Sequence, residues 1–179
     1  MLAAALDRYL HGQRVDVQAV AADLGLGRTT IYRWFGSREG LLGEVLVAAA
    51  EPVFDTARRE ARGSGGRALL NTFDRINRAL ASAPALRSFL EQERDALRII
   101  TSGAGVVQPH MVARITGFVE DEVRAGGFVP PVEPAILAYA IVRLAEAFLF
   151  NDAVRGIRGD VERLRVIEAA LLGLDPSTA

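Results

Sequence analysis

With 179 residues, half of them hydrophobic, the chain is long enough for one buried core and a small second domain. It has no cysteine, which excludes disulfides, thiolate metal sites and a cysteine nucleophile and fits the cytoplasm, where we expect the protein. The 21 basic residues are all arginine and are balanced by 22 acidic ones, so affinity for a polyanion must come from a local basic patch. The most apolar run, residues 135–150, is too short to span a membrane and is interrupted by Arg143 and Glu146.

The first expected helix covers residues 2–10 and turns one face to a core. That face carries Leu2, Leu6 and either Leu10 or Tyr9. Residues 17–24 follow as a second helix, because apolar side chains recur at i, i+3, i+4 and i+7. These side chains are Val17, Val20, Ala21 and Leu24. Asp16 precedes the helix as its N-cap, and Gly25 ends it with a left-handed residue.

A third helix, over residues 28–35, is two turns long and has two different faces. The apolar side carries Ile31, Trp34 and Phe35. The polar side carries Arg28, Thr29, Tyr32 and Arg33. The second and third helices together form a helix-turn-helix, whose second helix fits the major groove of DNA with donors for phosphates or base edges. An ordinary helical corner with a solvated polar face is the alternative.

The motifs along this segment are specific. They are Gly25-Leu26, Thr29-Thr30, the run IYRWF over residues 31–35, Ser37-Arg38 and Leu41-Leu42. In this order they resemble the DNA-binding domain of the TetR family of bacterial transcriptional regulators. The sequence departs from the family pattern at two positions, since Val17 stands where Ser or Thr is common and Arg38 replaces the usual lysine.

The resemblance implies a role for each matching position. Side chains expected to face the bases are Arg28, Thr29 and Arg33. Side chains expected to face phosphates are Thr30, Tyr32, Trp34 and Arg38.

The rest of the chain is expected to be helical, since no segment has the period of a strand. Ser37 caps a helix that runs to about Ala50, and Pro52 is expected to kink or restart it. Residues 63–66, Gly-Ser-Gly-Gly, are interpreted as a linker, because a phosphate-binding loop would have to follow a strand. Later helices are expected at about residues 67–80, 84–100, 109–125, 135–151 and 160–172.

Enzymatic and metal chemistry is not indicated. His11 and His110 lie far apart in sequence, and neither belongs to a Glu-x-x-His arrangement. The carboxylates of residues 120–122 are consecutive on a helix, point in different directions and are expected to be solvated. We therefore predict that the protein is not an enzyme and has no cofactor and no metal site.

The expected fold is all-α, with a helix-turn-helix DNA-binding domain over residues 1–50. Residues 51–179 would form the helical regulatory domain that the resemblance implies, which binds a ligand and dimerises. The residues expected to line its pocket are Phe89, Gln92, Met111, Ile115, Phe118, Tyr139 and Arg143. The same apolar stripes could instead fill a core. Residues 98–108 and 137–154 are similar to the family branch that contains the repressor of a quorum-signal lactonase, so a lactone or related acyl compound is the expected inducer.

The last two helices are apolar nearly all round, which indicates burial on two sides. Apolar side chains spaced for packing are Leu137, Ile141, Leu144 and Phe148 on one, and Val161, Leu164, Ile167, Leu171 and Leu174 on the other. We predict that these helices form a four-helix bundle with a second copy of the chain. Arg143 and Glu146 are spaced to pair, either at an exposed rim or at the pocket or interface.

The sequence thus predicts a homodimeric repressor that a small-molecule inducer releases from double-stranded operator DNA. The alternative is a helical ligand-binding module without DNA-binding activity, in which the helix-turn-helix is only structural. Clustering of Arg28, Arg33 and Arg38 on one exposed face would favour the repressor.

Overall fold

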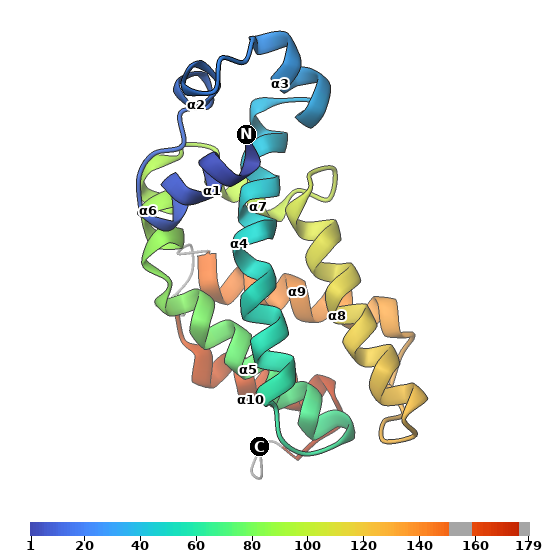
Figure 1. Ribbon diagram of the computed structural model, residues 1–179. Helices are drawn as coiled ribbons and strands as arrows, with labels where there is room; N and C mark the ends of the chain where they lie inside the picture. Colours follow the sequence, from blue (N-terminus) through green and yellow to red (C-terminus); the bar gives the residue numbers. More distant parts are fainter. Residues whose placement is uncertain (151–158, 176–179) are drawn as a thin grey trace. The chain divides into compact units, whose positions relative to one another are not determined.

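The computed structural model describes residues 1–150 and 159–175, except for the side chain of Arg28, and these residues form helices joined by loops (Figure 1). The helices of this part are α1 (Leu2–Leu10), α2 (Val17–Asp23), α3 (Arg28–Phe35), α4 (Arg38–Glu60), α5 (Gly65–Ser82), α6 (Pro84–Gln92), α7 (Ala96–Thr101), α8 (Val107–Arg124), α9 (Pro134–Phe150) and α10 (Val161–Leu171). No described residue belongs to a β-strand, and the all-α prediction is confirmed. None of these helices is both long and apolar enough to cross a bilayer.

The helices group into two compact units. The first contains Met1–Pro52 and Ala83–His110, and the second contains Val53–Ser82 and Met111–Ala179. The helix-turn-helix segment therefore shares its unit with α6 and α7, which come later in sequence. The division into domains 1–50 and 51–179 stays a prediction, since these units are defined by contacts and not by function.

Helix α4 continues through Pro52, where the sequence predicted a kink or a restart. Buried side chains lie on both sides of the proline, with Leu46 before it and Phe54 and Ala57 after it. Packing of both segments outweighs the cost of a proline inside a helix, about 3 kcal/mol. The predicted restart at this point is wrong, and the predicted kink stays a prediction.

The predicted linker over residues 63–66 is also shorter than expected, because α5 begins at Gly65 and both Gly65 and Gly66 are buried. The N–H of Gly65 donates to Glu122 Oε2 at 2.7 Å, and Arg58 Nη2 donates to Glu122 Oε1 at 2.7 Å. Glu122 is therefore buried, and each of its carboxylate oxygens accepts a hydrogen bond, although the sequence predicted a solvated carboxylate. Gly65 has a φ of +60°, and a Cβ there would lie 1.9 Å from the Gly127 carbonyl oxygen, so close packing explains the glycine.

The predicted helix over residues 84–100 is two helices, α6 and α7, separated at Glu93–Asp95. Glu93 has extended backbone, with a φ of −103° and a ψ of 113°, and its side chain is held by Arg38. The apolar stripe continues across the break, with Phe89 and Ile100 both buried. Periodicity alone could not locate this interruption.

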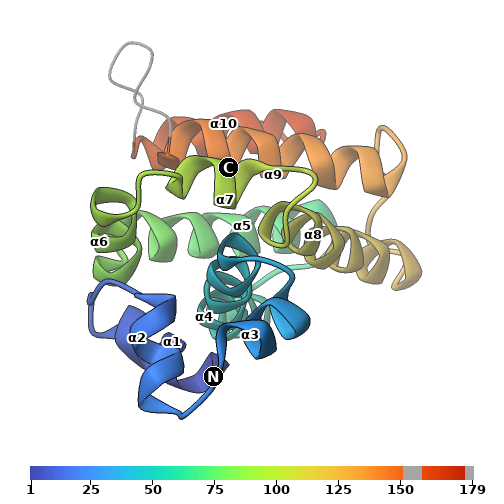
Figure 2. The ribbon, with the colours of Figure 1, turned by 90° about the horizontal axis from the view of Figure 1, so that it is seen from above.

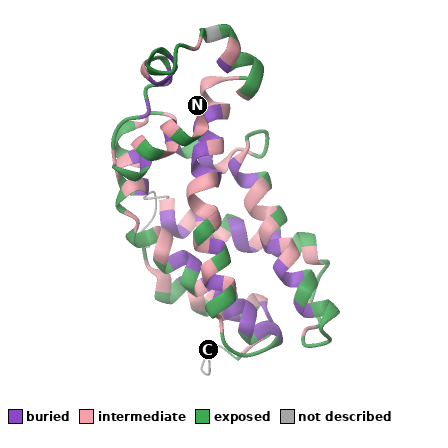
Figure 3. Ribbon diagram, viewed as in Figure 1, coloured by how far each residue is buried: buried purple, intermediate pink, exposed green. Residues whose placement is uncertain are grey.

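In the second unit, α10 packs on α5 and α9, and Figure 2 shows α9 and α10 side by side. One face of each helix is buried in the protomer, as Leu137, Ile141 and Leu164 demonstrate. The opposite face leaves large apolar side chains exposed, with Ile136 56% and Val166 47% accessible. Figure 3 colours the residues by burial and shows buried, intermediate and exposed positions along the helices.

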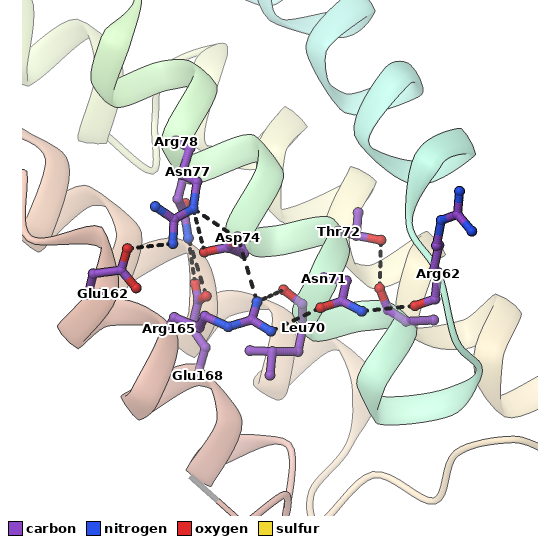
Figure 4. A network of polar contacts seen from close by, with 11 residues as sticks. Arg62, Leu70, Asn71, Thr72, Asp74, Asn77, Arg78, Glu162, Arg165 and Glu168 are labelled. Carbon is purple, nitrogen blue, oxygen red and sulfur yellow. Dashed lines mark hydrogen bonds and ion pairs between the residues drawn. The ribbon is translucent and has the colours of Figure 1, made fainter. Parts of the chain in front are cut away.

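A buried polar contact joins α5 to α10 within this core (Figure 4). Asn77 Nδ2 donates to both carboxylate oxygens of Glu168, at 3.0 and 3.2 Å, and both residues are buried. Nearby, Arg165 donates to Asn71 Oδ1 at 3.0 Å and approaches Asp74 at 3.6 Å. Burial raises the pKa of Glu168 to about 8, because an amide compensates a buried charge poorly.

Candidate DNA-binding surface

The turn between α2 and α3 is built by capping at both ends of α2. The Asp16 carboxylate accepts the N–H groups of Gln18 and Ala19 at 2.8 and 3.1 Å, as the N-cap prediction required. At the other end, the N–H of Leu26 donates to the Ala21 carbonyl at 2.8 Å, and Gly25 has a φ of +64°. These contacts form a Schellman motif, which stops α2 and redirects the chain.

Helix α3 has the bounds predicted from the sequence and rests on the protein through Ile31, which is 3% exposed. Thr29 and Arg33 lie one turn apart on the exposed side, flanked by Tyr32, which is 56% exposed. This face offers a hydroxyl, a guanidinium and a phenol, all of which can donate hydrogen bonds to phosphates or base edges.

The placement of Trp34 beside Ile31 on the apolar side is wrong, since its side chain is 53% exposed. A position three residues further along lies roughly 60° to one side of Ile31, which leaves Trp34 at the edge of the buried face. Its ring meets Phe35 edge-on, with the centroids 6.4 Å apart. Leu24 was also assigned to the buried stripe of α2, but it is the exposed C-cap of that helix.

The junction between α3 and α4 is tight. Gly36 has a φ of +69°, and the Ser37 hydroxyl accepts the N–H of Gly40 at 2.9 Å, which confirms Ser37 as the cap of α4. A Cβ at Gly40 would lie 2.0 Å from the Phe35 carbonyl oxygen. The absence of a side chain at Gly40 therefore lets the end of α3 approach the start of α4.

Arg38, the first residue of α4, is bound by Glu93 at the end of α6. Arg38 Nη1 donates to Glu93 Oε1 at 3.2 Å, and Arg38 Nη2 pairs with Glu93 Oε2. Of the predicted arginine cluster, Arg33 is exposed, Arg38 is held in this ion pair, and the Arg28 side chain lies outside the described residues. Sequence reasoning missed Glu93, whose one signal was a charged residue within an apolar stripe, four residues after Phe89.

Comparison with known proteins identifies the family. The family model for the Tetracyclin repressor-like, C-terminal domain matches residues 64–173, more than half of the chain. The chain belongs to the TetR family. The solved structure of the TetR-family transcriptional repressor QsdR of R. erythropolis is similar over 97% of this chain and 92% of that one, with 27% identity and a TM-score of 0.87. The search of curated proteins gave no match.

Membership of the TetR family makes this protein a DNA-binding transcription regulator, with α2 and α3 as its helix-turn-helix. Regulators of this family are typically not enzymes. Among the described residues, no three histidine or acidic side chains are grouped as a metal site would require.

The residues predicted to line a ligand pocket in this TetR-family chain divide between the two compact units. In the first unit, the buried ring of Phe89 meets the ring of Tyr9 at 6.1 Å, and Gln92 Nε2 donates to the Gly12 carbonyl at 3.0 Å. Both residues border a small cleft beside α1, together with Glu93. Burial raises the pKa of Tyr9 to about 12, so its phenol stays neutral.

The other pocket candidates belong to the second unit. Ile115 and Phe118 are buried on α8, where Arg58 and Arg114 lie over the Phe118 ring at 5.7 and 5.1 Å. Met111 is partly buried on α8, and Tyr139 is half exposed on α9. A single pocket formed by all seven candidates stays a prediction.

Arg143 and Glu146 pair as their spacing predicted, with Arg143 Nη1 2.8 Å from Glu146 Oε2. The pair is not an exposed rim contact, because Glu146 is buried while Arg143 is half exposed. Arg143 therefore bridges the buried side of α9 and its outer side.

Proposed function

We propose that this TetR-family regulator is a homodimeric repressor that binds double-stranded operator DNA and releases it when a small-molecule inducer binds. The observation that carries the proposal is the exposed donor face of α3, on a helix fixed by Ile31 and by caps at both ends of α2. The similarity to the repressor QsdR over nearly the whole chain supports repression rather than activation. The protein would act on chromosomal DNA in the cytoplasm.

Within the operator complex, the residues of α3 and Arg38 of α4 would fall into two groups. Bases would be read by Arg28, Thr29 and Arg33. Phosphates would be bound by Thr30, Tyr32, Trp34 and Arg38. The central position of Thr29 and Arg33 and the flanking, exposed rings of Tyr32 and Trp34 support this division.

The homodimer would form through the outer faces of α9 and α10. Exposed aliphatic side chains such as Ile136 and Val166 lie opposite the faces that pack in the protomer core. A helix that is apolar on both sides is stable in water only when both sides are covered. A two-fold axis then places two α3 helices in successive major grooves, about 34–36 Å apart.

An inducer would bind among the helices of the regulatory part and favour a conformation that cannot bind DNA. The resemblance to the quorum-signal branch supports a lactone or related acyl compound. Such a ligand needs a largely apolar pocket with a few polar groups, and Gln92, Tyr139 and Arg143 are the members of the predicted lining that carry polar groups.

Selection of bound duplexes from a random DNA pool tests the proposal, followed by titration of the selected site with Arg33→Ala. A base-reading arginine contributes about 1–3 kcal/mol, so the variant should bind the selected site roughly 5- to 150-fold more weakly. Its affinity for unselected DNA should change much less.

Arg124→Ala is the matched control, because Arg124 is an exposed arginine on α8 whose ion pair with Asp121 is also solvent-exposed. It should bind like the wild type. Failure to enrich any sequence would instead favour the alternative function, a helical ligand-binding module whose helix-turn-helix is structural.

A further inference from the structure

Glu93 is held rigidly beside the DNA-binding helices. It is the C-cap of α6, where its N–H donates to the Phe89 carbonyl at 2.9 Å. Its side chain is only 9% exposed, and one of its carboxylate oxygens also accepts the N–H of Asp95 at 3.4 Å. The hydrogen bond from Arg38 holds the pKa of this carboxyl below its ordinary value, so it is ionised at neutral pH.

Both terminal nitrogens of Arg38 donate hydrogen bonds to this carboxylate. Two parallel hydrogen bonds between a guanidinium and a carboxylate form one of the stronger polar contacts in proteins. A phosphate that approaches the same end of the guanidinium needs the same two donors, so this bidentate contact requires Arg38 to leave Glu93. A poorly solvated carboxylate would then lose its partner, which opposes the exchange.

We propose that Glu93 competes with the operator phosphate for Arg38 and thereby sets the affinity of the protein for DNA. This inference rests on the proposed DNA-binding function. It places an affinity-determining residue on α6, outside the helix-turn-helix but inside the same compact unit. Movement of the α6 end would change how strongly Arg38 is held.

A second ion pair distinguishes this competition from a general effect of charge. Glu39, the next residue of α4, lies 3.6 Å from Arg98 of α7, and both side chains are more exposed than Glu93. Glu39→Gln removes one negative charge from the same end of α4 without touching the partner of Arg38. It is therefore the matched control for Glu93→Gln.

The test measures operator affinity over a salt series for the wild type, Glu93→Gln, Arg38→Ala and the double variant. One additional phosphate contact steepens the plot of log K against log salt by about 0.9, and should tighten binding roughly five- to tenfold near 0.1 M salt. Glu93→Gln should show both changes. The double variant should show neither relative to Arg38→Ala, because the gain requires Arg38.

Any gain from Glu39→Gln should persist when Arg38 is alanine. The inference is overturned if Glu93→Gln binds with unchanged or weaker affinity while thermal unfolding shows it folded, or if its gain survives in the double variant. A wild type that selects no DNA sequence would overturn the proposed function itself, so the two failures are distinguishable.

Discussion

Replacing Ile136 and Val166 by glutamate is expected to turn the proposed dimer into a monomer that no longer holds operator DNA. Both side chains lie on the outer faces of α9 and α10 and are about half exposed in the protomer. A charge at either position therefore costs the protomer fold little, while it would be buried at the proposed interface.

The size of the effect follows from symmetry, because each position occurs twice across a two-fold axis. Four aliphatic side chains are lost, and each contributes about half of the 1.5–3 kcal/mol of a fully buried one, because the protomer already buries the other half. Dimerisation should weaken by at least about 3 kcal/mol, which is more than 10²-fold in the dissociation constant. Sedimentation of the variant at micromolar concentration should give the mass of one chain.

Val123→Glu provides the control, since Val123 is an exposed valine on α8 and does not belong to the two helices of the proposed interface. It should remain dimeric and bind DNA. A double variant that stays dimeric and binds the operator normally would show that α9 and α10 do not form the interface.

Glu168→Gln is expected to raise stability strongly at alkaline pH and to leave it nearly unchanged in acid. The Glu168 carboxyl is buried, and its hydrogen-bond donor is the Asn77 amide. A glutamine oxygen can accept the same hydrogen bond without any charge. Thermal or urea unfolding between pH 5 and 9 measures the difference.

The sign follows from the raised pKa, about 8 in the folded chain against an ordinary value near 4.5. Between these values the folded state keeps a proton that the unfolded state has lost, so the free energy of unfolding falls as pH rises. The stability that the raised pKa of Glu168 contributes to the folded state is complete below about pH 4.5 and is lost by the time the pH passes 8. At about 1.4 kcal/mol per pKa unit, the loss is on the order of 4–5 kcal/mol, and Glu168→Gln should remove it.

Other charges surround this carboxyl and set the size of the shift. On α5, Asp74 opposes ionisation, while on α10 Arg165 favours it but is itself engaged by Asn71 and Asp74. Glu162→Gln, which changes an exposed carboxylate of α10 that pairs with Arg78, should leave the pH dependence intact. Parallel pH curves for the wild type and Glu168→Gln would contradict the assignment.

The helix-turn-helix could be predicted from the sequence because the contacts that end its helices are local. Asp16 and Gly25 act through neighbouring backbone groups, so their capping roles and the bounds of α3 could be predicted. The restart expected at Pro52 does not occur, because burial of side chains on both sides of the proline outweighs its local penalty.

Glu93 and Glu168 were not predicted from the sequence either, because their partners lie far away in sequence. Glu93 and its partner Arg38 are 55 residues apart, and Glu168 and Asn77 are 91 residues apart. One signal was available, because Glu168 follows Leu164 by four residues on the buried face of α10, where an apolar residue is expected. Only tertiary structure supplies the partner that explains such a residue.

The half-site spacing of the selected operator tests the central claim, a two-fold dimer that reads DNA with α3, most directly. Five base pairs inserted between the half-sites turn one recognition surface to the opposite side of the duplex. A rigid dimer should then lose its specific affinity and bind only as it binds unselected DNA. Unchanged affinity for the lengthened site would contradict the account, because it would mean that each helix-turn-helix binds independently of the other.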